Sequence, residues 1–114
     1  MKPVISMTTL ADGEMIACSV DGVDVLLCRV AGQHYAVSNH CSHAHQALAA
    51  GRLKGYVVSC PLHGARFDVR DGRCLAAPAT QPISTYEVML ERGKVHVAVG
   101  VEDQPPKPRF GPMN

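Results

Sequence analysis

The segments Cys41-Ser42-His43 and Cys60-Pro61-Leu62-His63-Gly64 each place one cysteine close to one histidine, and sixteen residues separate the two segments. A deprotonated thiolate and a neutral imidazole are both good ligands for iron or zinc. In most structural zinc sites, cysteines come as one close pair and histidines as another. A mixed pair in each of two segments suits a binuclear cluster better, because two cysteines can converge on one iron while two histidines reach the other.

Turn signals surround these segments. Pairs ending in glycine stand nine or ten residues apart between residues 12 and 32 and are more widely spaced after that, and the runs between them are rich in β-branched residues. The pairs are Asp12-Gly13, Asp21-Gly22, Ala31-Gly32, Lys54-Gly55, Asp71-Gly72 and Arg92-Gly93. This rhythm predicts an all-β domain of short antiparallel strands.

Two hairpins are predicted most clearly. Asp21-Gly22 lies between Met15–Val20 and Val23–Val30, and Asp-Gly easily supplies the positive φ angles of a tight hairpin turn. Near the C-terminus, apolar and more polar residues alternate on both sides of Gly93, which is the pattern of a half-buried hairpin. The apolar positions are Tyr86, Val88, Leu90, Val95, Val97 and Val99.

Residues 39–51 and 60–64 do not fit strands, and we interpret both as loops that carry cysteine and histidine. Residues 75–82 contain two prolines, so we expect this stretch to be irregular as well. We assign residues 1–101 to one domain. Residues 102–114 contain four prolines and little apolar periodicity, which predicts a flexible tail.

The composition argues against nucleic-acid binding and against a membrane-spanning segment. Eleven basic residues nearly balance ten acidic ones, so no nucleic-acid partner is expected. No apolar stretch reaches the roughly 18–20 residues of a membrane span, and the N-terminus lacks a secretory signal. We therefore expect a cytoplasmic protein.

Five cysteines argue against a disulfide framework. We expect Cys18 and Cys28 to be buried in strands, and Cys74 to be an inert thiol.

Together these motifs resemble the Rieske iron–sulfur signature. The similarity continues through Phe67-Asp68, Gly72, Pro78, Pro82 and Tyr86-x-Val88. It implies the Rieske fold, which is all-β, with antiparallel sheets and a small cluster-binding subdomain that holds one [2Fe–2S] cluster. By this resemblance Cys41 and Cys60 bind the buried iron, His43 and His63 bind the outer iron, and Pro78 lies in a third loop that covers the cluster.

Respiratory Rieske proteins carry one further cysteine in each cluster loop, and these two cysteines form a disulfide. The matching positions here are Gln46 and Leu62, so that disulfide cannot form. The pattern is therefore more similar to the ferredoxin component of bacterial aromatic-ring-hydroxylating dioxygenase systems. His45 stands where many of these ferredoxins have glycine, which makes His45 the alternative to His43 as a ligand.

The resemblance implies an electron carrier that takes one electron from a flavin-dependent ferredoxin reductase and passes it to a terminal oxygenase. We expect a monomer without catalytic residues of its own. About fifty residues follow the second cluster segment, too few for the additional iron domain of an oxygenase. The alternatives are an accessory subunit of another redox enzyme, such as a nitrite-reductase-like small subunit, and a zinc-stabilised interaction module.

Overall fold

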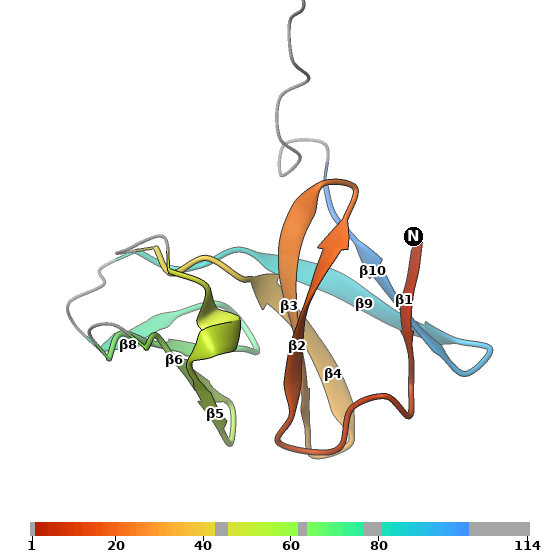
Figure 1. Ribbon diagram of the computed structural model, residues 1–114, viewed down its shortest axis with the longest axis horizontal. Coiled ribbons are helices and arrows are strands. Elements are labelled where there is room, and N and C mark those ends of the chain that lie inside the picture. Colours follow the sequence, from red (N-terminus) through yellow and green to blue (C-terminus); the bar gives the residue numbers. More distant parts are fainter. Residues whose placement is uncertain (1, 43–45, 62–63, 77–80, 101–114) are drawn as a thin grey trace, which may run out of the picture.

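Two antiparallel sheets are built from residues 2–42, 46–61, 64–76 and 81–100, which are the residues that the computed structural model describes (Figure 1). The larger sheet has the strand order β1-β10-β9-β4-β3-β2, and the smaller has the order β5-β6-β7-β8. The larger sheet consists of β1 (Lys2–Ser6), β2 (Met15–Val20), β3 (Val23–Val30), β4 (Gln33–Ser38), β9 (Thr85–Glu91) and β10 (Lys94–Ala98). The smaller consists of β5 (Arg52–Lys54), β6 (Val57–Ser59), β7 (Arg66–Asp68) and β8 (Cys74–Ala76). The predicted all-β class with a small subdomain is confirmed.

The hairpin of β2 and β3 forms as the sequence predicts. Val20 pairs with Val23 across the turn, and both turn residues have positive φ, 50° at Asp21 and 80° at Gly22. This is the backbone conformation that a two-residue hairpin loop requires.

Two expectations about strands need correction. Residues 75–82 were expected to be irregular from their start, yet Cys74–Ala76 forms β8, because it pairs with β7. Leu90 shares the alternating pattern of β9 but is 47% exposed. β4 pairs with β9 only through Ala36 and Val37, so the end of β9 that carries Leu90 extends beyond β4 and pairs with β10 alone.

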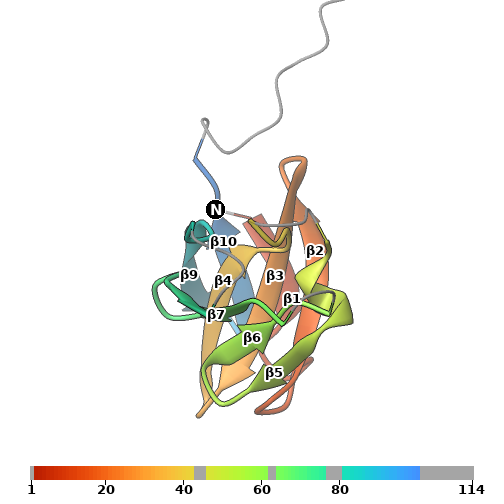
Figure 2. The ribbon, with the colours of Figure 1, turned by 90° about the vertical axis from the view of Figure 1, so that its left-hand side faces the viewer.

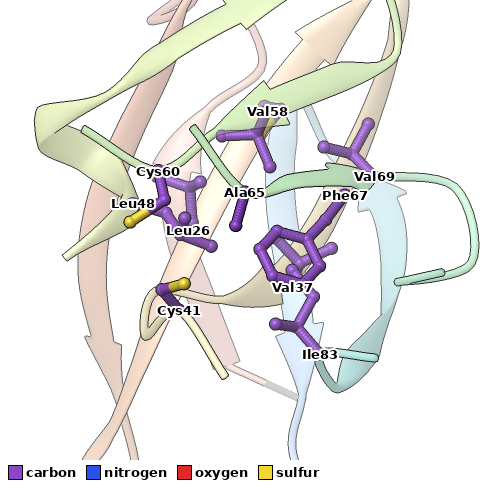
Figure 3. Packing of buried hydrophobic residues seen from close by; sticks show 11 residues of the cluster. Leu26, Val37, Cys41, Leu48, Val58, Cys60, Ala65, Phe67, Val69 and Ile83 are labelled. Carbon is purple, nitrogen blue, oxygen red and sulfur yellow. The ribbon is translucent and has the colours of Figure 1, made fainter. Parts of the chain in front are cut away.

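β3 and β4 separate two hydrophobic cores. On one face, Leu26 and Val37 join the first core, which lies between the two sheets and contains Phe67 (Figure 3). On the other face, Leu27 and Ala36 join the second core, within the larger sheet. Alternate residues of a strand point to opposite faces, so the same two strands serve both cores.

The small sheet is inserted between two neighbouring strands of the large one. The chain leaves the large sheet at the end of β4 and returns at β9, and these two strands pair with each other. Just beyond the ladder, Ser38 N–H donates a hydrogen bond to Ser84 O at 2.9 Å. Within the described residues, no helix is long and apolar enough to cross a membrane, and the predicted tail, 102–114, lies outside them.

Candidate metal centre

Cys41 and Cys60 lie together at one edge of the first core. Cys41 follows β4 and Cys60 follows β6, so the two cysteines come directly after strands of two different sheets. Cys41 is 1% exposed and Cys60 is 3% exposed. Neither forms a disulfide, and Figure 3 shows them beside Leu48 and Leu26. The structure therefore brings together the two cysteines that the sequence assigned to the buried iron.

Each of these cysteines begins a loop that is closed by the same kind of hydrogen bond. Cys41 N–H donates to Gln46 O at 2.9 Å, and Cys60 N–H donates to Ala65 O at 2.7 Å. We call residues 41–46 the first loop and residues 60–65 the second loop. The predicted histidine ligands, His43 and His63, and the alternative ligand His45 belong to these loops by sequence and lie outside the described residues.

Asn39 anchors the chain on both sides of the first loop. Its N–H donates to Asp24 O at 3.0 Å, and its O accepts from Leu48 N–H at 2.7 Å. Its side chain donates through Nδ2 to Asp24 Oδ2 at 3.1 Å and accepts at Oδ1 from Ala49 N–H at 2.9 Å. Asn39 is 3% exposed, and a buried amide with this many partners fixes the local backbone firmly. Sequence reasoning missed this residue.

Gly51 brings the end of the first loop's segment against the start of the second loop. It follows a short 3₁₀ turn, Leu48–Ala50, and its N–H donates to Leu48 O at 2.9 Å. A Cβ atom at position 51 would lie 1.8 Å from Ser59 O, far inside van der Waals contact. Only glycine allows this approach, and Ser59 directly precedes Cys60.

An ion pair braces the strand that follows the second loop. Arg70 Nε donates to Asp68 Oδ1 at 3.0 Å, and Arg70 Nη2 donates to Asp68 Oδ2 at 2.7 Å. These side-chain hydrogen bonds, chiefly, lower the pKa of the Asp68 carboxyl. The Arg70 guanidinium also lies 4.1 Å from the centroid of the Tyr56 ring, a distance typical of a cation–π contact.

A third segment attaches to the same edge. Ser42 Oγ donates to Gln81 O at 2.7 Å, and Ile83 N–H donates to Gly72 O at 2.9 Å. Gly72 has a φ of 78°, and a Cβ there would lie 2.1 Å from Ile83 O. The predicted third loop contains Pro78, which lies outside the described residues, but the chain that leaves this loop is held against the first loop.

The remaining cysteines differ from Cys41 and Cys60. Cys28 is fully buried in β3, and burial raises the pKa of its thiol to about 12. Burial, followed by the charge of Asp24, also raises the pKa of Cys18. Both shifts favour the protonated thiol, whereas the thiolate is the form that binds a metal. The buried position predicted for Cys28 is confirmed, whereas Cys18 is only partly buried.

Two free thiols in an apolar pocket, each at the start of a closed loop, fit a soft metal centre. Thiolates favour iron–sulfur clusters, copper(I) and zinc, and apolar surroundings keep water from a cluster and influence its potential. The described residues alone do not choose among these metals, whereas the family of the fold does.

The chain belongs to the Rieske [2Fe–2S] domain family. The model of that family matches residues 1–87. The resemblance inferred from the sequence is thereby confirmed, and with it the [2Fe–2S] cluster as the cofactor.

Relatives from aromatic dioxygenase systems are similar over most of the chain. The ferredoxin component of the naphthalene 1,2-dioxygenase system of Pseudomonas putida is 37% identical over 93 residues, 82% of this chain and 89% of the relative. The ferredoxin component of biphenyl 2,3-dioxygenase of Rhodococcus jostii (strain RHA1) is 42% identical over 97 residues, 85% of this chain and 91% of the relative.

Solved structures of similar proteins share the fold. The ferredoxin of carbazole 1,9a-dioxygenase from Nocardioides aromaticivorans IC177 superposes with a TM-score of 0.83 at 36% identity, covering 85% of this chain and 95% of that one. A chain from a complex of reduced oxygenase and oxidised ferredoxin in carbazole 1,9a-dioxygenase gives a TM-score of 0.81 at 32% identity, covering 85% of this chain and all of that one.

Proposed function

We propose that this chain is an electron-transfer ferredoxin that carries one electron from a flavin-dependent ferredoxin reductase to a terminal oxygenase of an aromatic-ring-hydroxylating system. The observation that carries the proposal is the pair of buried loop cysteines, Cys41 and Cys60, on a Rieske frame. The relatives bear out the predicted role of carrier, since they are ferredoxin components of dioxygenase systems. This chain matches 89% of the first of them, so it corresponds to that carrier nearly end to end.

The four cluster ligands are part of the proposal. Cys41 and Cys60 would hold the buried iron, and His43 and His63 would hold the outer iron. When bound, the cluster accepts and releases a single electron. The chain's own contribution is to hold the two thiols in fixed positions through the loop-closing hydrogen bonds, and to shield them with the apolar side chains of the first core.

Location and oligomeric state are also proposed. We place the carrier in the cytoplasm, where thiols stay reduced, because its three cysteines outside the loops form no disulfide. We propose that it acts as a monomer, because a shuttle must bind and release its partners in turn. Strict co-purification with one enzyme would instead favour the accessory-subunit alternative.

Metal analysis with ligand variants tests the centre. The purified protein should contain two irons and two acid-labile sulfides per chain, as one [2Fe–2S] cluster requires. His43→Ala and His63→Ala should abolish the cluster spectrum, whereas His45→Ala should leave it nearly intact. Loss of the cluster only in the His45 variant would move the ligand assignment, and a colourless protein with one zinc would refute the proposal.

The reduction potential gives a second test. Gln46 and Leu62 replace the disulfide cysteines of respiratory Rieske proteins, so we expect fewer hydrogen bonds to the sulfurs and a lower potential. Protein-film voltammetry should place the potential toward the low end of the Rieske range of about −150 to +300 mV. A value in the upper third of that range would contradict this reasoning.

A further inference from the structure

Charge is divided unequally between the two sheets. The small sheet and its turns, residues 52–76, contain five basic residues and two acidic ones, whereas the other described residues contain four basic and six acidic ones. The chain as a whole carries a net charge of only +1. The near-neutral total therefore conceals a positive half, and this half contains the second loop.

The positive charge of this half is concentrated on one face. Arg52, Ser59 and Arg66 form one row across β5, β6 and β7, and directly paired residues point to the same side of a sheet. The neighbouring row, Leu53, Val58 and Phe67, packs into the first core. The Arg52 row therefore points outward, away from the large sheet, which lies behind the small sheet in Figure 2.

Three cations lie on this outward face. Arg52, Lys54 and Arg66 are all exposed. None of them forms an ion pair with another described residue. The carboxylate that does share the face, Asp68, is buried and held by Arg70. We call Arg52, Lys54 and Arg66 the basic face.

The basic face begins where the second loop begins. Ser59, between the two arginines, directly precedes Cys60, and Arg66 directly follows Ala65, the residue that closes the loop. Arg52 and Arg66 are two strands apart, which places their backbones about 9.5 Å from each other. A hollow beside this face is lined by Ala50, Gly51, Arg52, Ser59, Cys60 and Pro61. A partner in contact with this face would also touch the second loop.

We propose that the basic face is a docking surface for an acidic surface on the terminal oxygenase. This inference rests on the proposed function. Three exposed cations that form no ion pair within the described part of the chain favour an anionic surface. Complementary charge raises the rate of encounter more than the final affinity. The oxygenase is the partner we assign, because a similar ferredoxin chain occurs in a solved complex with its oxygenase.

Stopped-flow oxidation of the reduced holoprotein by the terminal oxygenase purified from the source organism tests the proposal. For the double variant Arg52→Glu/Arg66→Glu, the second-order rate constant should fall about tenfold at low ionic strength, within the range expected for electrostatic steering. At about 0.5 M salt the difference from wild type should shrink below about twofold, because exposed charges are then screened. The milder Arg52→Gln/Arg66→Gln should give a smaller loss with the same salt dependence.

A matched control separates an effect of the basic face on the rate from an effect of the total charge of the chain. Arg92→Glu/Lys94→Glu makes the same change of charge on the hairpin of β9 and β10, which lies at the opposite end of the molecule from the small sheet (Figure 1). The control should stay within about twofold of wild type at every ionic strength. Unchanged visible spectra establish that the variants retain the cluster, and the glutamine pair remains a test if the glutamate pair fails to fold.

The outcomes are distinct. Equal slowing by both glutamate pairs would show an effect of net charge and overturn the basic face. Slowing only of the earlier step, reduction of the chain by the reductase, would assign the face to the reductase and overturn the proposed partner. Normal rates in every variant would overturn the surface while leaving the electron-carrier role intact. A wild-type chain that never reduces the oxygenase would refute the proposed function, and this inference with it.

Discussion

The two cluster loops close in the same way but are held in place by different means. Each begins with a cysteine whose N–H bonds to a carbonyl further along the loop. The first loop is secured by hydrogen bonds from a buried side chain, that of Asn39. The second is secured by close backbone packing, where Gly51 meets Ser59. Hydrogen bonds can be removed one at a time by substitution, so an anchor of this kind can be weakened gradually. A close backbone contact tolerates almost no added side-chain atoms.

Gly51→Ala should have the largest effect, because it breaks the packing that positions the second loop. The new Cβ would clash with Ser59 O, so the backbone must move, at a cost of about 3 kcal/mol. We expect lower stability in urea titrations and loss of most of the cluster absorbance. Ala50→Ser, at the exposed neighbouring position, is the control and should retain both.

A variant that kept the full cluster and wild-type stability would show that packing at Gly51 does not position the second loop. The difference in mechanism between the two loops would then disappear.

Asn39→Ala should come next, because it removes the anchor of the first loop. Ala49 N–H would lose its buried acceptor, which costs about 1–3 kcal/mol. Hydrogen–deuterium exchange measured by mass spectrometry should accelerate in residues 41–47 and stay near wild type in residues 60–65. Equal acceleration in both segments would show that the loops are not anchored separately.

Asp68→Asn should have a moderate effect on the strand that leaves the second loop. It weakens the ion pair with Arg70, whose side chain is largely exposed. We therefore expect the free energy of unfolding to fall by about 1 kcal/mol at pH 7. The pKa of Asp68 is lowered in the folded state, so the unfolded state binds more protons as the pH falls below about 4. The stabilisation is therefore present above that pH and is lost on acidification.

Denaturant titrations at several pH values measure this effect. The difference in stability between wild type and Asp68→Asn should narrow as the pH falls through the lowered pKa. A difference that stayed constant down to pH 2 would mean that the carboxylate charge does not stabilise this strand.

Ser42→Ala should have the smallest effect. It removes the hydrogen bond to Gln81, which is worth about 0.5–1 kcal/mol, and Ser42→Thr should retain the bond. Thermal unfolding of the two variants measures the difference. If Ser42→Ala destabilised the chain more than Asn39→Ala, the third segment would be a stronger anchor of the first loop than Asn39.

The sequence predicted the structural features that depend on local residue patterns. The Asp21-Gly22 turn signal predicted the hairpin of β2 and β3, and the alternation of apolar and polar residues predicted the last hairpin, β9 and β10. The strands of the small sheet have three residues each, which is too short for periodicity to be recognised, and β8 was therefore interpreted as irregular. The paired cysteines could be found because their residue types and spacing carry the chemistry.

The anchors of the loops could not be found in this way. Gly51 resembles an ordinary turn glycine, and its requirement arises only from Ser59, which a different strand brings against it. Asn39 stands next to a predicted loop, where asparagine is common. Its partner Asp24 is fifteen residues away, and a single sequence does not reveal which of several aspartates is near.

The pairing of β4 with β9 has a consequence for how the chain folds. The small sheet is made entirely of strands that are neighbours in sequence, so its contacts are local and need little loop-closure entropy. The segment that contains it leaves and rejoins the large sheet where Ser38 bonds to Ser84, which resembles the arrangement of a domain inserted into a host. We therefore expect the small sheet to form early as a unit, and the long-range pairing of β1 with β10 to close the molecule last.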